Sequence, residues 1–180
     1  PISVILLSSL KTQSLDQSRG LEVGADDYIT RPIENRELAA RIEAHLRLKA
    51  ARNELAEKER LLSAVVNGIP SQLYLIDPDF RITWTNATTQ HELDRPEHEL
   101  IGRKCHDLLM GNTDTCTDCP AVTSFQTATS AQDIVTFPDG TIKQCKSIPM
   151  INDEGRVERV LKIDTDISAR QKAEDALIKQ

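Results

Sequence analysis

Residues 70–85 read PSQLYLIDPDFRITWT and contain two apolar segments separated by a turn. The segments Gln72–Asp77 and Arg81–Thr85 carry the branched and aromatic side chains that are typical of strands. Pro78-Asp79 lies between them and favours chain reversal. This stretch therefore predicts a β-hairpin.

Two further turns downstream indicate three more strands. Asp133–Phe137 and Thr141–Ile148 flank Pro138-Asp139-Gly140, and Arg156–Thr165 follows Asp153-Glu154-Gly155. The residues between the second and third predicted strands show only short helical patterns. Five antiparallel strands with helices inserted in this way predict an α+β domain.

A long helix is predicted before this domain. From about Asn35 the apolar residues follow helical spacing, and the pattern continues as a heptad repeat. The repeat consists of Leu48, Leu55, Leu62 and Ile69, with Ala51 and Val65 at two intermediate positions and Lys58 at the third. It indicates a parallel coiled coil, and hence a homodimer joined through the linker helices. A single amphipathic helix that packs on the next domain is the alternative.

The first residues show a strand–helix–strand order. Ile2–Leu7 is a continuous apolar run, typical of a parallel strand covered on both faces. A polar helical stretch over roughly Leu15–Val23 ends at Gly24, and Asp27–Thr30 is a short strand ended by Pro32. Together with the helix that follows, this is one βαβ unit plus a helix. Because the chain lacks an initiator methionine and begins in mid-strand, we expect it to be a fragment.

The composition argues against several classes of function. The 180 residues include 22 Lys and Arg against 28 Asp and Glu, which gives a net charge of −6. Such an acidic chain has little to neutralise a run of phosphates, so we expect no nucleic-acid partner. No apolar stretch approaches the roughly 18 residues that span a bilayer, and the N-terminus lacks the basic flank of a signal peptide. We therefore expect a cytoplasmic protein without a membrane segment.

The segment Gly24–Pro32, GADDYITRP, closely resembles the fifth strand of response-regulator receiver domains. With Ile5–Ser9, the resemblance covers about the first 48 residues and implies an incomplete α/β receiver fragment. It implies that Ser8 is the hydroxyl that moves toward the phosphorylated aspartate and that Tyr28 is the aromatic residue that changes rotamer. Arg31 stands where the family has a phosphate-contacting lysine before a cis-proline.

That arginine departs from the family pattern. A planar guanidinium does not replace a compact ammonium at a tight phosphoryl site. Arg31 is therefore either a phosphate contact or an ordinary surface cation in a receiver that no longer switches. The phospho-accepting aspartate of the family would lie upstream of Pro1, so this chain is not expected to accept phosphate.

From about Leu61 to Ser168 the pattern is similar to PAS domains. Its successive motifs are VNGIP (66–70), PDGT (138–141) and NDEG (152–155). The exit DTDISAR, residues 164–170, resembles the signalling motif with which sensory PAS domains enter their output helix. The resemblance implies that Asp164 and Asp166 transmit the signal, and we expect Asp166 to tie the final strand to the outgoing helix by a polar contact.

The predicted organisation follows from these resemblances. A receiver fragment spans residues 1–48 and a helical linker spans 49–68. A PAS domain, with a five-stranded antiparallel sheet and flanking helices, spans 69–168, and an output helix starts over 169–180.

Four cysteines fall in one stretch of the predicted PAS domain: Cys105, Cys116, Cys119 and Cys145. The C-x-x-C spacing of the middle pair lets both thiols hold one cation, and four thiolates suit zinc or an iron–sulfur cluster. A subset of bacterial PAS domains looks similar, with a cysteine in this helix followed by C-x-x-C-P. A reversible disulfide between Cys116 and Cys119, or structural thiols without a cofactor, are the alternatives.

The histidines and the tryptophan give weaker signals. We expect His45, His91 and His98 to be solvated. His106, beside Cys105, is a candidate ligand of haem or metal, but solvent exposure is the simpler expectation. Trp84 is expected in the core of the second predicted strand.

Three functions fit the sequence. The first is a non-catalytic sensor in a two-component phosphorelay, which passes a ligand, redox or partner signal to an output domain of the same chain, a histidine kinase or a diguanylate cyclase. The second is a ligand-free PAS dimerisation module. The third, a thiol oxidoreductase using Cys116 and Cys119, is disfavoured because no strand runs into Cys116 as it does in thioredoxin-like enzymes.

Overall fold

The computed structural model describes residues 4–9, 22–116 and 118–178. The chain divides into two compact units, Pro1–Leu62 and Ser63–Gln180. The predicted helix over Leu15–Val23 lies almost entirely outside the described residues.

The first unit contains a pair of parallel strands, as the sequence predicted. β1 (Ile5–Ser8) and β2 (Asp27–Thr30) pair with Ser8 opposite Thr30. Ile29 is buried, and the Arg31–Pro32 peptide bond is cis. The described strands therefore match the parallel order expected of a βαβ unit.

The helix α2 (Asn35–Asn67) runs over 33 residues without interruption, and none of its residues is buried. The leucines at the predicted heptad positions are exposed: Leu48 by 50%, Leu55 by 59% and Leu62 by 63%. Ile69 was predicted to continue the repeat, but this prediction is wrong because the helix ends before it. Gly68 closes the last turn on the carbonyls of Ala64 and Val65, and Pro70 follows shortly after, as is common beyond helix ends.

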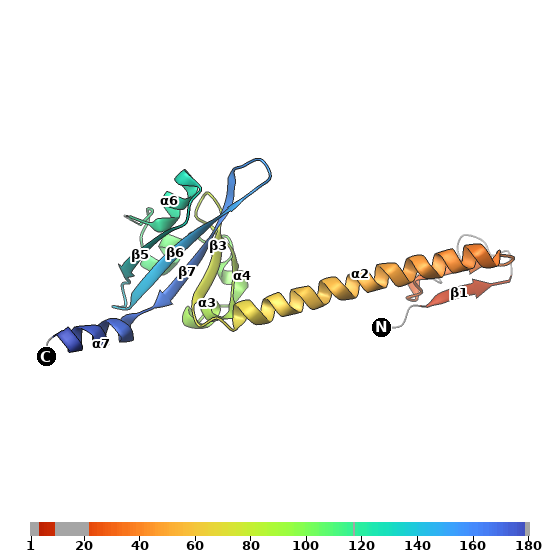
Figure 1. Cartoon of the computed structure of the whole chain (residues 1–180), viewed down its shortest axis with the longest axis horizontal. Coiled ribbons are helices and arrows are strands. Elements are labelled where there is room, and N and C mark those ends of the chain that lie inside the picture. The colour runs from red at the N-terminus through yellow and green to blue at the C-terminus, as the bar shows by residue number, and fades with distance from the viewer. Residues whose placement is uncertain (1–3, 10–21, 117, 179–180) are drawn as a thin grey trace. The chain divides into compact units, whose positions relative to one another are not determined.

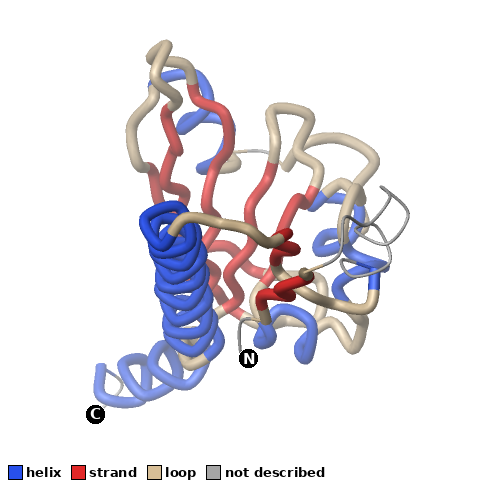
Figure 2. Tube along the Cα trace, turned by 90° about the vertical axis from the view of Figure 1, so that its right-hand side faces the viewer, coloured by secondary structure: helices blue, strands red, loops and turns tan. Residues whose placement is uncertain are grey.

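The second unit is built on one antiparallel sheet of five strands in the order β4-β3-β7-β6-β5 (Figures 1 and 2). The strands are β3 (Gln72–Ile76), β4 (Ile82–Thr85), β5 (Ala131–Thr136), β6 (Ile142–Ile151) and β7 (Val157–Asp166). Every pair of neighbours is antiparallel. The five predicted strands and the helical insertion between the second and third are confirmed.

Short helices cover one face of this sheet. They are α3 (Ala87–Glu92), α4 (Glu97–Leu100), α5 (Cys105–Met110) and α6 (Pro120–Thr127), and α7 (Ser168–Ile178) follows the last strand. Helix α6 packs on β5, β6 and β7, and α3 packs on β3 (Figure 1). Among the described helices, none is both long and apolar enough to cross a membrane.

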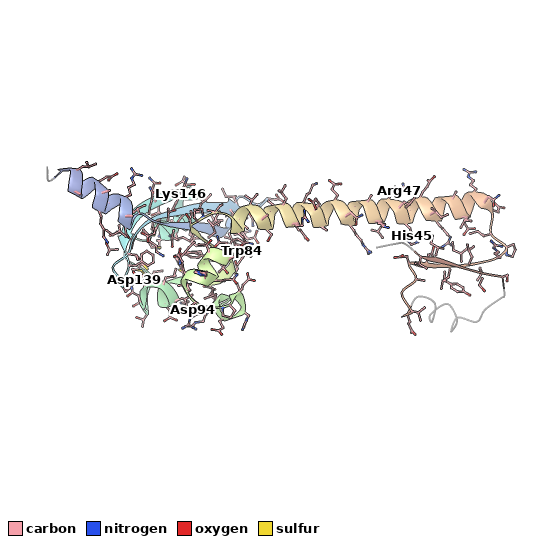
Figure 3. All side chains as sticks on the ribbon, turned by 90° about the horizontal axis from the view of Figure 1, so that it is seen from below. His45, Arg47, Trp84, Asp94, Asp139 and Lys146 are labelled. Atoms are coloured by element: carbon pink, nitrogen blue, oxygen red, sulfur yellow. The ribbon has the colours of Figure 1, made fainter. Side chains whose placement is uncertain are left out.

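The core of the second unit lies between the sheet and these helices. Its buried members are Tyr74, Ile76, Ile82, Cys105, Ala121 and Val160. Phe80 packs edge-to-face on Phe125, with 5.6 Å between the ring centroids. Trp84 was predicted in this core, but it is only half-buried (Figure 3). It lies opposite the half-buried Leu75, while Ile82 and Thr85 are the buried residues of β4.

Candidate functional site

The helix-covered face of the sheet is polar at its centre. Lys143, Cys145 and Ser147 of β6 are buried, and so are Lys162 and Asp164 of β7. Because side chains alternate along a strand, each of these sets shares one face. Cys145 lies opposite Asp164 in the sheet register, and Ser147 lies opposite Lys162. Two strands therefore place charged and polar groups where small domains usually place aliphatic ones.

A cavity of about 270 Å³ borders this polar face. All four cysteines line it, so we call it the four-cysteine cavity. Its apolar walls include Leu109 and Met110 of α5 and Phe137, which follows β5. The volume is slightly below the roughly 300–1,000 Å³ of pockets that hold drug-sized ligands. The cavity is therefore suited to a small molecule.

Among the described residues, Lys162 and Asp164 are the only acidic and lysine side chains that line this cavity. Lys162 Nζ lies 3.6 Å from Asp164 Oδ1, whereas Tyr74 Oη donates a 2.7 Å hydrogen bond to Asp164 Oδ2. Asp164 Oδ1 has no hydrogen-bond partner among the described residues. Although burial opposes the charge of Lys162, the nearby carboxylate raises the pKa of its ammonium. Burial, followed by the charge of Asp164, raises the pKa of Tyr74 well above its usual value, so the phenol remains a donor.

The four thiols of the cavity differ in exposure. Cys105 and Cys145 are buried, and Cys116 and Cys119 are half-buried. Burial raises the pKa of Cys105 to about 12, and it also raises the pKa of Cys116 and of Cys145. Since the thiolate is the nucleophile and the metal ligand, these three thiols are weak in both roles. In this state they behave as small, soft apolar groups.

The described part of the chain contains no three His, Cys, Asp or Glu side chains that together could hold a metal ion. A zinc ion or an iron–sulfur cluster on the four cysteines would require the thiols to approach one another, so the metal hypothesis stays a prediction. The cysteines are free, and a reversible Cys116–Cys119 disulfide stays a prediction as well.

His106 was expected to be solvent-exposed, but it is 3% exposed and lines the four-cysteine cavity. The N-terminus of α5 is fixed against β4, because Arg81 and Lys104 form an isolated bridge and the Cys105 N–H donates to the Phe80 carbonyl. This holds the first turn of α5 in the core. Neither ring nitrogen of His106 has a described hydrogen-bond partner.

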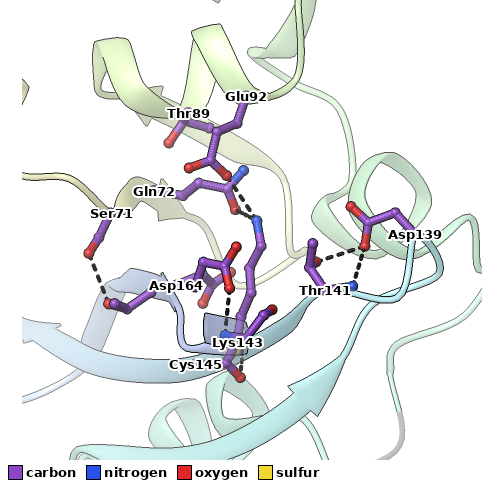
Figure 4. Close-up of polar contacts among 12 residues, drawn as sticks. Ser71, Gln72, Thr89, Glu92, Asp139, Thr141, Lys143, Cys145 and Asp164 are labelled. Atoms are coloured by element: carbon purple, nitrogen blue, oxygen red, sulfur yellow. Dashed lines mark hydrogen bonds and ion pairs between the residues drawn. The ribbon is translucent and has the colours of Figure 1, made fainter. Parts of the chain in front are cut away.

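A second hollow adjoins the four-cysteine cavity and shares Leu109 and Phe137 with it. In this hollow the buried Lys143 donates to Gln72 at 3.1 Å and to Glu92 at 2.9 Å (Figure 4). Its ammonium also lies 5.0 Å from the ring centroid of Phe137. Phe137 therefore separates two buried lysines, and Lys143, unlike Lys162, has good hydrogen-bond partners.

The expected polar contact of Asp166 is present at the exit of the sheet. Asp166 Oδ1 accepts a 2.8 Å hydrogen bond from the Ser168 backbone N–H, at the first residue of α7. The Ser168 hydroxyl in turn accepts from the Ile142 backbone N–H at 2.9 Å. Hydrogen bonding to Ser168 lowers the pKa of Asp166. The contact is confirmed, whereas its role in transmission stays a prediction.

Asn86 is a junction that the sequence did not reveal. It is fully buried, and its amide nitrogen donates to the carbonyls of Val66 in α2 and of Ser71. Its Oδ1 accepts from the backbone N–H groups of Leu73 and of Thr89, which lies in the first turn of α3. A second link, between the hydroxyls of Ser71 and Thr165, joins the same region to the end of β7 (Figure 4). The start and the end of the domain therefore share one polar network.

The residues singled out by the receiver resemblance lie close together in the first unit. Arg31 N donates to the carbonyl of Ser8, and Tyr28 lies on β2 beside β1. Asp27 lies 3.4 Å from Arg41 and 3.3 Å from His45. Although burial opposes it, the Tyr28 N–H, His45 and Arg41 hold the pKa of Asp27 below its usual value.

Two of the three histidines expected to be solvated are exposed, namely His91 and His98. The expectation for His45 is wrong in part, because the side chain is only 24% exposed. Figure 3 labels this side chain on α2. The contact with Asp27 explains this burial.

Comparison with known proteins identifies the second unit. Residues 66–172, more than half of the chain, match the family model described as "PAS fold". An RNA-binding Light-Oxygen-Voltage receptor is similar, with a TM-score of 0.55 and 17% identity over 69% of this chain and 37% of that one. The PAS domain of BvgS from Bordetella pertussis has a TM-score of 0.51 and 13% identity, over 72% of this chain and 99% of that one. At these identities the likeness concerns the fold alone.

Proposed function

The chain belongs to the PAS fold family, which confirms the predicted fold class, and we propose that its PAS domain senses a small molecule in the four-cysteine cavity and signals through α7. One observation carries this proposal. The charged pair of the cavity and the residue that caps the outgoing helix lie on the same strand. Lys162, Asp164 and Asp166 occupy every second position at the end of β7. PAS domains are sensory rather than catalytic, so we expect no enzyme activity from these residues.

The proposed transmission follows from this geometry. A ligand that draws Lys162 or Asp164 toward the cavity would shift the end of β7, and with it the Asp166 carboxylate that caps α7. Phe137 offers a second route, because it borders both hollows and contacts Lys143, which lies opposite Asp166 in the sheet. Small shifts of this kind are amplified when packed elements have two discrete arrangements.

We place this sensor in a two-component phosphorelay. The parallel β1–β2 pair and the proximity of Ser8 and Arg31 support the interpretation of residues 1–48 as part of a receiver. The output domain of the same chain would be a histidine kinase, with a diguanylate cyclase as the second choice. Four free thiols suit a reducing compartment, so we propose a cytoplasmic location.

We also propose that two copies of the chain pair through α2. The exposed Leu48, Leu55 and Leu62 support a coiled coil, because they would lie on one stripe of the helix. The same leucines favour a second function, a ligand-free dimerisation module. The thiol oxidoreductase is disfavoured, since burial raises the pKa of Cys116 and no strand leads into it.

Filling the cavity tests the sensing role. Cys145→Met enlarges a buried cavity residue, whereas Gln144→Met places the same side chain on the exposed face of the same strand. We expect Cys145→Met, and not Gln144→Met, to change the hydrogen exchange of the α7 amides. Equal exchange in both variants, with the fold retained, would leave the dimerisation module as the better hypothesis.

A further inference from the structure

Three buried polar groups that line the four-cysteine cavity lack adequate partners. Asp164 Oδ1 and both ring nitrogens of His106 have none among the described residues. Lys162 Nζ lies 3.6 Å from Asp164 Oδ1, which is longer than an ordinary hydrogen bond. Buried polar groups without partners are rare in native proteins and usually mark a missing water, ion or ligand.

The charges of the cavity restrict the ligand. Lys162 and Asp164 neutralise each other, and no other lysine, arginine or acidic side chain of the described residues lines the cavity. An anion would accept from Lys162 but face the carboxylate of Asp164, and a cation would face the ammonium. A molecule without net charge avoids both repulsions, provided that it offers an acceptor to one group and a donor to the other.

We propose that the four-cysteine cavity binds a small uncharged amide, either a primary amide or a lactam, whose oxygen accepts from Lys162 Nζ and whose N–H donates to Asp164 Oδ1. This inference rests on the proposed sensing function and names the chemical class of its ligand. It also accounts for the unequal use of the carboxylate, because Tyr74 donates to Oδ2 while Oδ1 has no hydrogen-bond partner among the described residues.

The spacing suits an amide edge. When C=O and N–H point the same way, a planar amide holds its oxygen and nitrogen roughly 2.3 Å apart. Two slightly splayed hydrogen bonds of ordinary length then reach partner atoms about 3–4 Å apart, and Lys162 Nζ and Asp164 Oδ1 are separated by 3.6 Å. A secondary amide in the usual trans form points its N–H away from its C=O, so it cannot bridge this pair.

The remaining walls suit the body of such a ligand. Leu109, Met110 and Phe137 are apolar, and burial raises the pKa of the Cys105 and Cys145 thiols, which favours their neutral form. Thioether and thiol groups make favourable contacts with flat, polarisable rings. His106 leaves a donor and an acceptor for one further polar group at the cavity wall.

Four probes with the same ring and different head groups test the class: benzamide, N,N-dimethylbenzamide, benzoate and benzamidinium. Each is titrated into the whole chain, and binding is followed by amide NMR shifts. We expect benzamide to bind at least about tenfold more tightly than the other three, since each loses one charge-assisted hydrogen bond or gains a repulsion. Tighter binding of benzoate or of benzamidinium would overturn the uncharged class.

A variant pair links binding to the proposed partners. Lys162→Met combined with Asp164→Asn removes both charges but keeps an acceptor for Tyr74, and Lys146→Met is the control on the exposed face of β6. We expect the double variant to lose benzamide binding by about tenfold or more, with the control unchanged. Unchanged binding in a folded double variant would overturn the assignment of these two groups.

The outcomes separate this inference from the sensing role. If no probe binds while Cys145→Met still alters α7, the amide class is wrong and the sensing role stands. If benzamide binds but leaves the hydrogen exchange of α7 unchanged, the amide site stands and the sensing role is wrong.

Discussion

The helix α2 and the five-stranded sheet differ in the kind of side chain that needs a further partner: apolar side chains on α2 and buried charged side chains on the sheet. Leu55 and Leu62 of α2 are 59% and 63% exposed, whereas Lys162 and Asp164 of β7 are 4% and 2% exposed. Apolar surface is stabilised when another apolar surface covers it, and buried polar groups are stabilised by hydrogen-bond partners. The two regions therefore need partners of different chemistry: a second helix for α2 and a small polar molecule for the cavity.

The difference also bears on how each region tolerates change. A substitution on an exposed helix face alters association and leaves the fold intact, because the side chains of that face are stabilised only by contact with a partner. A substitution of one member of the buried pair alters the free energy of unfolding directly, because it leaves the other charge buried without its counter-ion. Four variants, ordered by expected effect, test this contrast.

The largest effect is expected from Lys162→Met alone. It leaves Asp164 as a buried carboxylate without its cation, which costs about 3–5 kcal/mol of unfolding free energy. Adding Asp164→Asn removes the remaining charge, so most of this loss should return. Urea denaturation at pH 7 measures both variants, with the exposed Lys146→Met as the control.

The pH dependence gives a second test of the same pair. The pKa of Lys162 is raised in the folded state. Its contribution is therefore fully present below its usual unfolded pKa of about 10.4 and is lost only as pH rises through the higher folded value. A single variant as stable as Lys146→Met would show that water screens the pair, and the contrast with α2 would then weaken.

The next largest effect concerns α2. Leu55→Asn with Leu62→Asn should convert a dimer of the whole chain to a monomer, because two apolar contacts worth together about 3 kcal/mol of association or more are lost. Arg52→Asn with Glu59→Asn is the matched control, since these exposed residues have the same spacing on the same helix. Sedimentation velocity distinguishes the species. A wild-type chain that sediments as a monomer would remove the coiled-coil hypothesis.

A smaller effect is expected at Asn86, where the last turn of α2 meets the sheet. Asn86→Ala removes the α3 cap and leaves the Val66 and Ser71 carbonyls without their donor, so we expect a loss of about 2 kcal/mol. Asn67→Ala, which removes two exposed hydrogen bonds, from Ala87 N and to Ser63 Oγ, should cost less than half as much. Thermal unfolding of both variants measures the difference, and equal losses would contradict a special role of the buried junction.

The sequence predicted where the strands lie better than it predicted which of their side chains are buried. The turns Pro78-Asp79 and Pro138-Asp139-Gly140 located the strands because proline and glycine act locally, through their own backbone preferences. The four cysteines indicated the region of the cavity, although their spacing suggested a metal site rather than the wall of a cavity. The local pattern therefore placed the site approximately.

Its charged residues could not be predicted in the same way. Nothing in the sequence marks Lys143 and Lys162 as buried, since an isolated lysine is rarely buried. Their partners explain the burial: Gln72 and Glu92 for Lys143, and Asp164 for Lys162. Helix α5 is too short for its periodicity to show that His106 faces inward. Burial at these positions depends on tertiary packing, which local periodicity does not encode.

The smallest effect is expected at Asp166, and it tests whether an exposed contact on β7 behaves differently from the buried pair on the same strand. Asp166→Ala removes the hydrogen bond to Ser168 N, and loss of such a cap costs about 1 kcal/mol of local helix stability. Because hydrogen bonding lowers the pKa of Asp166, its contribution is present above the usual aspartate pKa of about 3.9 and is lost as pH falls through the lower folded value. Asp166→Asn retains a cap that does not titrate. Protection of the α7 amides, measured as hydrogen exchange relative to the intrinsic rate at each pH, should therefore fall on acidification in the wild type but not in Asp166→Asn. An identical acid response in both would show that another group controls the exit helix.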